Sequence, residues 1–483
     1  MAINTVIAVN MTLRILAFVL MTPLASVSLA QSTYTLKECI EIAQENNIIA
    51  QQAQLNAKQG GVNYDVAKYA RMPNLNSSIN NSFNFGRTID PFTNAFVNQN
   101  VTAVSMNLGS SVTLFNGFRL KNNIESARKS YEAGELNIET IKNNVAIDVA
   151  ALYLSALMAK EQVKTFENNI AQTTEQLNRI KILLDAGATT IDRKYELEAQ
   201  ISNDELQLIN SKNNAQIALL NLRIYMNSNV DEAFEITPLD DFNVEDLTEP
   251  GNIELAQVVA ENFNNLPQVL RDQLLLESTE ADLNSANGNR LPSLTFAASV
   301  NSLYSSRSQV AENPRLETFN IGYVEGTNDP VFTTTQVFDY STPGFFNQFE
   351  NNFGQTFGFT MSIPIYNRYQ VTAGIENAKI NNQRQYLTLQ NTKNQVQNDI
   401  YLSYLAWQAA EKAYNAAEKA FESQKVLLEQ TELRYNAGAT SYFDYQTARN
   451  SFTNALVNLN RSKFDLIFKE KSFGFYLGKE ITE

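Results

Sequence analysis

The sequence contains no histidine and only one cysteine, and these two shortages exclude many kinds of site. Without histidine there is no histidine-based catalytic triad, and most zinc sites lose their usual ligands. The single cysteine, Cys39, leaves no disulfide within one chain. It falls at an apolar position of a helical pattern, so we expect it to be buried as a small hydrophobic residue. We therefore expect no enzyme, no cofactor and no metal site.

Two further absences concern location and partners. Beyond residue 30, no stretch approaches the about 18–20 unbroken apolar residues of a membrane-spanning helix. The net charge is −14 and no polybasic stretch is present, which argues against a nucleic-acid partner. Residues 1–30 contain one charge and an apolar run, and they end Ser28-Leu29-Ala30. This pattern is typical of a secretory signal peptide cleaved after Ala30. We expect an exported protein.

What the sequence does contain is a long internal repeat. Residues 111–227 align without a gap on residues 362–478, at an offset of 251 positions. Upstream, residues 71–75 match residues 290–294 at an offset of 219, so the second copy carries 32 additional residues. A duplicated unit of this length decides the fold class before any local motif does.

The repeat divides the chain into segments. An insert at 305–352, polar, aromatic and rich in turn residues, accounts for the additional residues of the second copy. If the strand pairs on either side of it belong to an outer-membrane barrel, we expect this insert to be extracellular, since the longer loops of such barrels face outward. The expected segments are a signal peptide (1–30), a first structural repeat (31–227) with a strand pair at 75–115, an acidic connector (228–252), a second repeat (253–478) with a strand pair at 294–365, and a C-terminal tail (479–483).

Four stretches alternate apolar and polar residues with the period of a β-strand. The first has Leu75, Ile79, Phe83 and Phe85 on one face, with asparagine and serine on the other. Each stretch has about 11–13 residues, which suits a tilted strand that crosses an outer membrane. A half-buried soluble sheet shows the same alternation, but the signal peptide favours the membrane. The other three stretches lie at about 104–114, from Leu294 onward with clear alternation to Val300, and at 353–365.

A very long helical pattern free of proline follows each strand pair. At 1.5 Å per residue, each of these helices would extend about 100 Å. A second helix follows in each copy, and its spaced aliphatic residues among Gln, Asn, Glu and Lys indicate coiled-coil packing. A capping box of Thr35 and Glu38 opens a helix to about Ala70. The remaining predicted helices are 120–184, 192–226, about 253–289, 371–436 and 443–477.

The number of strands constrains the assembly. Four strands cannot close a barrel, and the open edges of a sheet cannot face lipid. If the strands cross a membrane, several chains must contribute to one barrel.

Several short motifs occur in a fixed order along the chain. They are Thr35-Leu36-Lys37-Glu38-Cys39-Ile40, Leu114-Phe115-Asn116-Gly117, Ile365-Tyr366-Asn367 and the run from Arg434 to Asp444. In these motifs and in this order of elements the chain resembles the TolC family of outer-membrane channel and efflux proteins, over essentially the whole mature sequence. The resemblance implies a mainly α fold with β-structure. It implies a homotrimer in which a 12-stranded β-barrel, with four strands per chain, continues into a long α-helical coiled-coil barrel.

The resemblance also implies a location and partners. The protein would lie in the outer membrane of a Gram-negative bacterium, against its lipid, with most of the chain in the periplasm. Its helix tips would dock onto a periplasmic membrane-fusion adaptor and, through it, an inner-membrane pump or transporter.

The two tips are the first candidate site. The run Ala186-Gly187-Ala188-Thr189 recurs as Ala437-Gly438-Ala439-Thr440. Small residues permit a tight turn with positive φ and leave the backbone open to a partner. A plain helical-hairpin turn would look the same, so docking at Gly187, Ala188, Thr189, Gly438, Ala439 and Thr440 rests on the resemblance.

The second candidate site lies one turn beyond each tip. There Asp192 and Arg193 in the first copy correspond to Phe443 and Asp444 in the second. The resemblance implies that Asp444 contributes to a ring of carboxylates at the periplasmic aperture, and a ring of acids selects cations. From register we expect Arg193 to pair with it. Solvated surface charges are the alternative. Some relatives have a basic residue where this chain has Thr440.

Three functions remain open. The first is the exit duct of a tripartite efflux system, which passively conducts small molecules to the exterior. The second is the exit duct of a type I protein secretion system. The third is a periplasmic coiled-coil scaffold that conducts nothing, although a scaffold has no need of four strands of membrane length.

Overall fold

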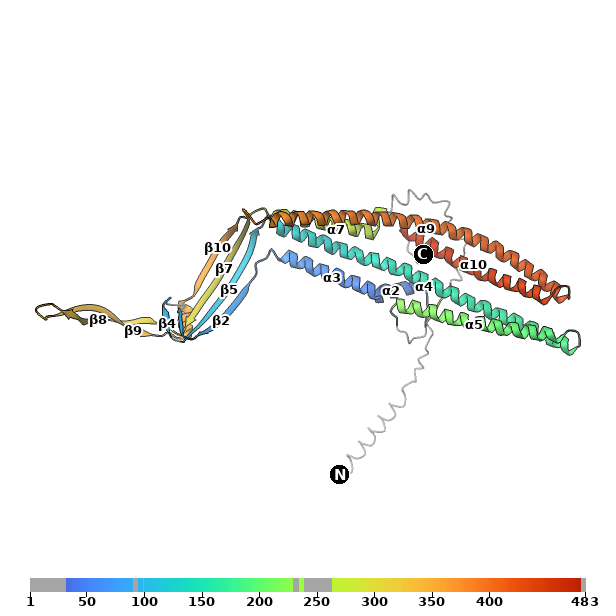
Figure 1. Ribbon diagram of the computed structural model, residues 1–483, viewed down its shortest axis with the longest axis horizontal. Helices are drawn as coiled ribbons and strands as arrows, with labels where there is room; N and C mark the ends of the chain where they lie inside the picture. The colour runs from blue at the N-terminus through green and yellow to red at the C-terminus, as the bar shows by residue number, and fades with distance from the viewer. Residues whose placement is uncertain (1–31, 90–93, 99, 229–233, 239–262, 479–483) are drawn as a thin grey trace, which may run out of the picture. The chain divides into compact units, whose positions relative to one another are not determined.

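The computed structural model describes residues 32–89, 94–98, 100–228, 234–238 and 263–478. The expected signal peptide, the C-terminal tail and most of the acidic connector lie outside these residues. The described chain is mainly helical with some sheet (Figure 1). Its described residues form two compact units: the first comprises those within Met1–Gln52, Thr140–Phe263 and Gln397–Glu483, and the second those within Ala53–Glu139 and Asn264–Val396.

The second unit contains an antiparallel sheet of four strands in the order β10-β7-β5-β2. The four stretches with period-two alternation are thus confirmed as strands of one sheet. One strand from each copy meets at the centre, where Asn107 lies opposite Asn301, and β2 and β10 are the edges. The strands are β2 Asn76–Asn84, β5 Val101–Phe115, β7 Ser293–Ser305 and β10 Gly354–Ser362.

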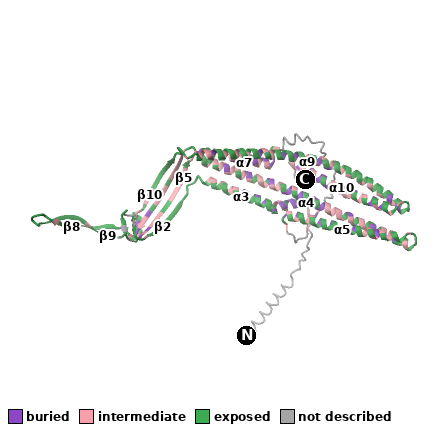
Figure 2. Cartoon of the chain, viewed as in Figure 1, coloured by how far each residue is buried: buried purple, intermediate pink, exposed green. Residues whose placement is uncertain are grey.

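The insert at 305–352 is more regular than the sequence predicted. Strands β8 (Val310–Tyr323) and β9 (Pro330–Ser341) form an antiparallel hairpin, and helix α8 (Phe345–Asn351) follows. The expectation of only four strands is therefore wrong. Two irregularities in the hairpin register, one of them beside Gly322, interrupt the alternation and hid these strands. The hairpin is exposed along its length (Figure 2).

Short strand pairs complete the β-structure of the described residues. Strands β3 (Arg87–Ile89) and β4 (Phe96–Asn98) are antiparallel, whereas β1 (Ser32–Tyr34) and β6 (Phe234–Ile236) are parallel.

The four long helices agree with the prediction to within one residue at each end. Helices α4 (Arg119–Asp185) and α9 (Gln370–Asn436) have 67 residues each, and α5 (Ile191–Tyr225) and α10 (Tyr442–Tyr476) have 35 each. None of the helices in the described ranges is both long enough and apolar enough to span a membrane.

Two predicted helices are interrupted in the structure, and residues 253–262 of the second one lie outside the described residues. The predicted capping box at Thr35 is confirmed, but the helix is divided into α2 (Leu36–Asn46) and α3 (Ile48–Tyr69). Asn47 between them is extended and donates from Nδ2 to the Tyr225 carbonyl oxygen, 2.8 Å away. The short 3-10 turn η3 (Phe263–Asn265) and an extended Leu266 precede helix α7 (Pro267–Gly288). The helix begins at Pro267 because a proline disfavours helical backbone angles in the residue before it.

The core of the first unit joins α2, α4, α5, α10 and β6. Cys39 is fully buried in it, as predicted, and burial raises the pKa of its thiol to about 12. The Tyr153 hydroxyl fastens the β1–β6 pair to α4 because it lies 3.1 Å from the Tyr34 carbonyl oxygen and 2.8 Å from that of Thr237.

Candidate functional site

The two helix tips have the same backbone structure. Gly187 has φ 72° and Gly438 has φ 73°, so each lies in the left-handed region that glycine favours. In the first tip the Gly187 amide donates to the Leu184 carbonyl at 2.9 Å and the Ala188 amide to that of Leu183 at 2.8 Å. This is the Schellman arrangement that ends a helix.

The second tip repeats these bonds, and both tips are open. The Gly438 amide donates to the Tyr435 carbonyl at 3.0 Å, and the Ala439 amide donates to that of Arg434 at 2.8 Å. A Cβ placed at either glycine would have no heavy atom within 4 Å. Large apolar side chains beside the tips are exposed, including Ile182, Ile191, Leu433 and Phe443.

The helices that follow the tips begin differently. Helix α10 starts with a capping box in which the Ser441 hydroxyl accepts from the Asp444 amide at 3.2 Å. The Asp444 carboxylate accepts from the Ser441 hydroxyl at 2.7 Å and from the Thr440 hydroxyl at 3.0 Å. These bonds hold the pKa of the Asp444 carboxyl below its usual value of 3.8. The N-cap of α5, Thr190, makes no such side-chain bond.

Arg193 and Asp444 have different partners within one subunit. The Arg193 guanidinium lies over the ring of Tyr435, 5.1 Å from its centroid. Asp444 is exposed and is bonded within its own capping box. Arg193 and Asp444 thus do not contact each other within the described chain. Arg193, which belongs to α5, instead contacts Tyr435 of α9. Asp192 is exposed in the first turn of α5, where a negative charge suits the helix dipole.

A cluster of three tyrosines surrounds this contact. The Tyr435 ring stacks on Tyr445 at 5.0 Å between centroids, and Tyr442 lies 6.1 Å from Tyr435. Gln176 Nε2 donates to the Tyr445 hydroxyl at 2.6 Å, and the Tyr442 hydroxyl donates to the Glu196 carbonyl oxygen at 3.3 Å. Burial raises the pKa of Tyr442 to about 12, so its hydroxyl is protonated at neutral pH and can donate the bond to Glu196.

Deeper in the first unit lies a buried ion pair that the sequence reasoning missed. Arg449 Nη2 on α10 is 3.0 Å from Asp204 Oδ2 on α5, and the two side chains are 6% and 9% exposed. A signal was available, because Arg449 follows the buried Tyr445 and Ala448 at helical spacing, where an apolar residue is expected. The repeat concealed it, since the positions matched at the 251 offset are Glu198 and Ala455.

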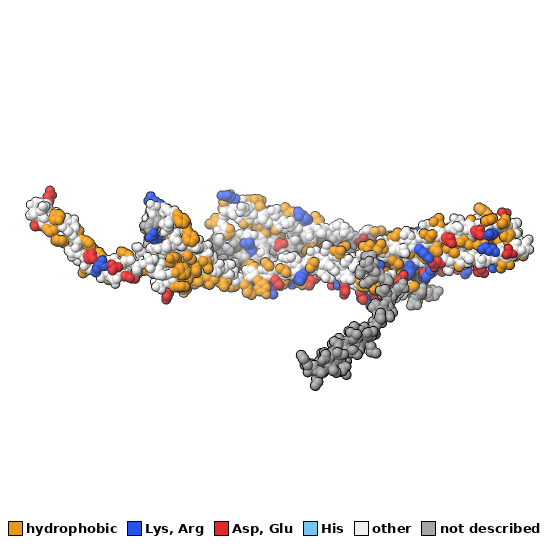
Figure 3. Space-filling model, turned by 90° about the horizontal axis from the view of Figure 1, so that it is seen from below, with side chains coloured by type: hydrophobic (Ala, Val, Ile, Leu, Met, Phe, Trp, Pro, Cys, Tyr) orange, Lys and Arg blue, Asp and Glu red, His pale blue; other side chains and the backbone are white. Residues whose placement is uncertain are grey.

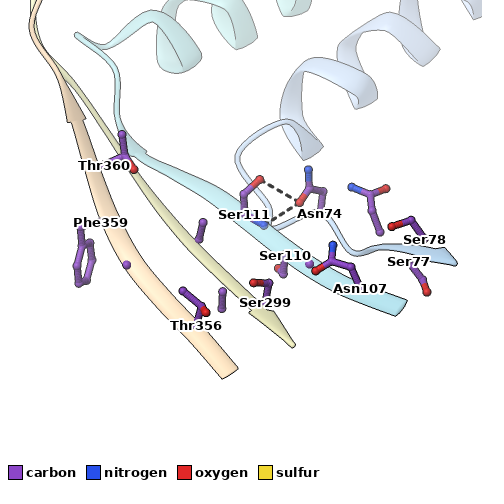
Figure 4. A pocket seen from close by; sticks show the side chains of 15 residues that line it. Asn74, Ser77, Ser78, Asn107, Ser110, Ser111, Ser299, Thr356, Phe359 and Thr360 are labelled. Carbon is purple, nitrogen blue, oxygen red and sulfur yellow. Dashed lines mark hydrogen bonds between the residues drawn. The ribbon is translucent and has the colours of Figure 1, made fainter. Parts of the chain in front are cut away.

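The sheet of the second unit carries a polar groove of about 510 Å³ on one face (Figure 4). Hydroxyl and amide side chains from neighbouring strands line it, among them Ser78, Asn107, Ser299 and Thr356. The Asn74 carboxamide accepts from both the backbone amide and the hydroxyl of Ser111, at 2.8 and 3.1 Å. The other face is apolar and exposed, and in Figure 3 hydrophobic side chains gather over the strands.

A family model described as outer membrane efflux protein matches residues 39–228 and 259–467. The chain belongs to the outer membrane efflux protein family. The resemblance to TolC-family channels is confirmed, and the family's members are channels of the outer membrane rather than enzymes.

A curated relative and solved structures agree with this family. The chain is 27% identical over 173 residues to outer membrane efflux protein BepC of Brucella suis biovar 1 (strain 1330), and the match covers 35% of each protein. It thus spans about a third of that relative's length.

The fold is that of solved outer-membrane channels. The open state of the Neisseria gonorrhoeae MtrE channel has a TM-score of 0.70 at 19% identity, over 95% of this chain and 94% of that one. The Campylobacter jejuni CmeC channel has a TM-score of 0.70 at 17% identity, over 93% of this chain and 87% of that one.

Proposed function

We propose that the chain is one subunit of a homotrimeric exit duct of a tripartite efflux system. Its strands cross the outer membrane, its helices extend into the periplasm, and the duct passively conducts small molecules. The observation that carries this proposal is the four-stranded sheet, which has one polar face without charge, one exposed apolar face and two unpaired edges.

The edges call for further copies of the chain. Within the described sheet, β2 and β10 are each paired on one side only. An unpaired strand edge in lipid leaves N–H and C=O groups without partners, which costs several kcal/mol for each group. Three chains, with β10 of one beside β2 of the next, would close a 12-stranded barrel. Such an arrangement also puts the three polar faces around one lumen.

The side chains suit this orientation. Strands β2, β5, β7 and β10 contain no Asp, Glu, Lys or Arg. The polar face offers hydroxyl and amide groups that hydrate a lumen. On the apolar face Phe357 is 79% exposed and Phe359 is 67% exposed in the isolated chain. These side chains are where a barrel of this type contacts lipid.

The tips are the proposed docking sites for a periplasmic membrane-fusion adaptor. The residues concerned are Gly187, Ala188 and Thr189 in the first tip and Gly438, Ala439 and Thr440 in the second. Support comes from the open space around both glycines and from the exposed apolar side chains beside them. Through the adaptor, an inner-membrane pump or transporter would supply the substrate.

The aperture gate is proposed at Asp192, Arg193 and Asp444. Asp444 is an anion at neutral pH, and its capping bonds lower its pKa further, so three copies would form a ring that favours cations. Arg193, held on the Tyr435 ring, would keep the two helical hairpins of a subunit together near this ring.

Two neighbouring residues on opposite faces of β10 provide the test of the duct. Thr356→Lys places a charge on the polar face, and we expect assembly to continue while ion selectivity in planar bilayers shifts toward anions. Phe357→Lys places the same charge on the apolar face, and we expect it to destabilise the barrel by about 2–4 kcal/mol. Heat-modifiable trimer on gels reports the assembly. If trimers assemble equally well with either substitution and the ion selectivity of the channel does not change, the proposed duct is refuted.

The kind of substrate is tested in a deletion strain. An efflux duct predicts increased sensitivity to antibiotics and detergents, restored by the native chain. A strain that keeps its resistance but loses a secreted protein would assign the duct to type I secretion instead.

A further inference from the structure

The ion pair between Arg449 and Asp204 is unusual among the charges of the described residues. It is the one ion pair there in which both side chains are less than a tenth exposed. Helices α4 and α5 form one helical hairpin, here called hairpin 1, and α9 and α10 form hairpin 2. Because Asp204 belongs to α5 and Arg449 to α10, the pair joins the two hairpins inside the first unit.

The pair is supported by further hydrogen bonds from both hairpins. Arg449 Nη2 also donates to the Asn169 carbonyl oxygen on α4 at 2.9 Å. Gln200 Nε2 donates to the second carboxylate oxygen of Asp204 at 2.7 Å, and Gln446 Nε2 on α10 donates to Gln200 Oε1 at 2.6 Å. The ion pair, the Arg449–Asn169 bond and the Gln446–Gln200 bond all cross the hairpin interface, so separation of the hairpins at this level would break them and take the opposite charge away from each ion. Removal of one partner from such a pair is strongly destabilising.

The contacts between this pair and the tips are of a weaker kind. They are the Arg193–Tyr435 contact, the Gln176–Tyr445 bond, the Tyr442 bond to the Glu196 carbonyl, and the packing of Tyr442 against an apolar cluster of hairpin 1 that contains Leu197. None of them joins two opposite charges. The Tyr435 hydroxyl is buried and makes no hydrogen bond to the described residues. The hairpins are therefore held less firmly near the tips than at Arg449, about two turns into α10.

We infer that the Arg449–Asp204 pair is the pivot of the proposed gate. When the aperture opens, the hairpins of one subunit separate on the tip side of the pair and stay together beyond it. This inference rests on the proposed function, because it concerns how that gate moves. It assigns the two residues a positioning role: they contact no substrate and limit how far the separation extends along the helices.

The helix α5 offers a reporter on each side of the pivot. Leu197, Asp204 and Ser211 are all buried on α5 and follow one another at seven-residue spacing, so they share one face. Leu197 is on the tip side and packs in a cluster with Tyr442 of hairpin 2. A cysteine at either position is shielded from a maleimide while the hairpins are together. The native Cys39 stays silent because it is fully buried and its thiol has a pKa of about 12.

The experiment compares labelling rates of Leu197→Cys and Ser211→Cys in native outer membranes. In a background loosened at the tip by Arg193→Ala and Tyr435→Leu, we expect the Leu197→Cys rate to rise about tenfold or more. The Ser211→Cys rate should stay as in the native chain. When Arg449→Ala and Asp204→Ala are added, the Ser211→Cys rate should rise as well. The double alanine variant leaves no unpaired buried charge, so it is expected to fold even if Arg449→Ala alone does not.

A second ion pair provides the matched control. Lys212 and Glu167 lie 2.9 Å apart with side chains 53% and 48% exposed, and both belong to hairpin 1. Lys212→Met with Glu167→Gln should leave both labelling rates unchanged. The pivot is refuted if Ser211→Cys becomes reactive while Arg449 and Asp204 are intact, or stays protected after both are removed. The labelling rates do not depend on whether the channel conducts. A chain that fails to conduct would therefore refute the proposed function, whereas the labelling rates alone test the pivot.

Discussion

Gly117 and Gly288 pass so close to each other that neither has room for a side chain. A Cβ on either residue would lie 2.3 Å from the carbonyl oxygen of the other. Gly117 lies between β5 and α4, with φ 68°, and Gly288 is the last residue of α7. The close approach gives a physical reason for the glycine in the motif Leu114-Phe115-Asn116-Gly117.

Gly288→Ala should therefore destabilise the second unit. The atom that the new methyl group meets belongs to the backbone, so the chain itself must shift, at a cost of about 1–3 kcal/mol. Gly374→Ala is the control, because Gly374 lies in α9 with no heavy atom within 4 Å of its Cβ position, and it should be neutral or stabilising. The temperature at which the assembled protein dissociates on gels measures both. Equal temperatures would contradict the close contact.

Substitutions at Gly438 separate the shape of the tip from its role in docking. Gly438→Val should cost about 1–2 kcal/mol because a β-branched residue disfavours positive φ. Gly438→Asn should preserve the turn, since asparagine tolerates this region, while it adds a side chain at the exposed tip. If the adaptor docks there, both variants lose efflux, whereas the heat-resistant trimer is unaffected by Gly438→Asn. Efflux retained in the asparagine variant would argue against docking at this residue.

Two variants of Asp444 separate its charge from its capping role. Asp444→Asn keeps a side-chain oxygen that can accept from the Ser441 hydroxyl but removes the negative charge. Asp444→Ala removes both. If the carboxylate ring selects cations, both variants lose cation selectivity in planar bilayers, and the alanine variant alone frays the start of α10. Selectivity that survives in the asparagine variant would show that Asp444 is only a cap.

The cap also predicts a dependence on pH. The folded pKa of Asp444 is lowered, so its contribution is complete above the unfolded value and is lost as the pH falls below 3.8. The protection of the amides in the first turn of α10, relative to their intrinsic exchange rates at each pH, should therefore decrease in acid. The first turn of α5, whose N-cap Thr190 makes no side-chain bond, is the internal reference. An equal response in both helices would contradict a role for the Asp444 carboxylate.

Arg193→Gln tests the contact between the hairpins at the aperture. Loss of the cation over the Tyr435 ring should remove about 0.5–1 kcal/mol in each subunit and give a leakier channel. The neighbouring Lys194→Gln is the control, because Lys194 lies over Tyr195 and pairs with Glu198 at 3.6 Å, and both of these residues belong to its own helix. Single-channel recordings distinguish the two. Identical closed-state leaks would show that the Arg193–Tyr435 contact does not hold the gate.

The helices and sheet strands could be predicted because their signals are local. The signals that mark the ends and faces of a helix act within a few residues: a glycine at a turn, a capping box and the period of the hydrophobic residues. The ends of α4, α5, α9 and α10 were therefore predicted to within one residue. The breaks at Asn47 and Leu266 were missed. Asn47 is held by the Tyr225 carbonyl, a contact that no local pattern contains. Pro267 was a local signal that the prediction passed over.

For the candidate site, the sequence by itself determined where the two tips are and which charges follow them. Only the tertiary structure decided the partners of those charges. The repeat placed Arg193 opposite Asp444, but the position of a residue within a repeat does not say which side chain it contacts. Arg193 instead lies on Tyr435, and Asp204 meets Arg449, since helices packed side by side bring together residues far apart in the chain.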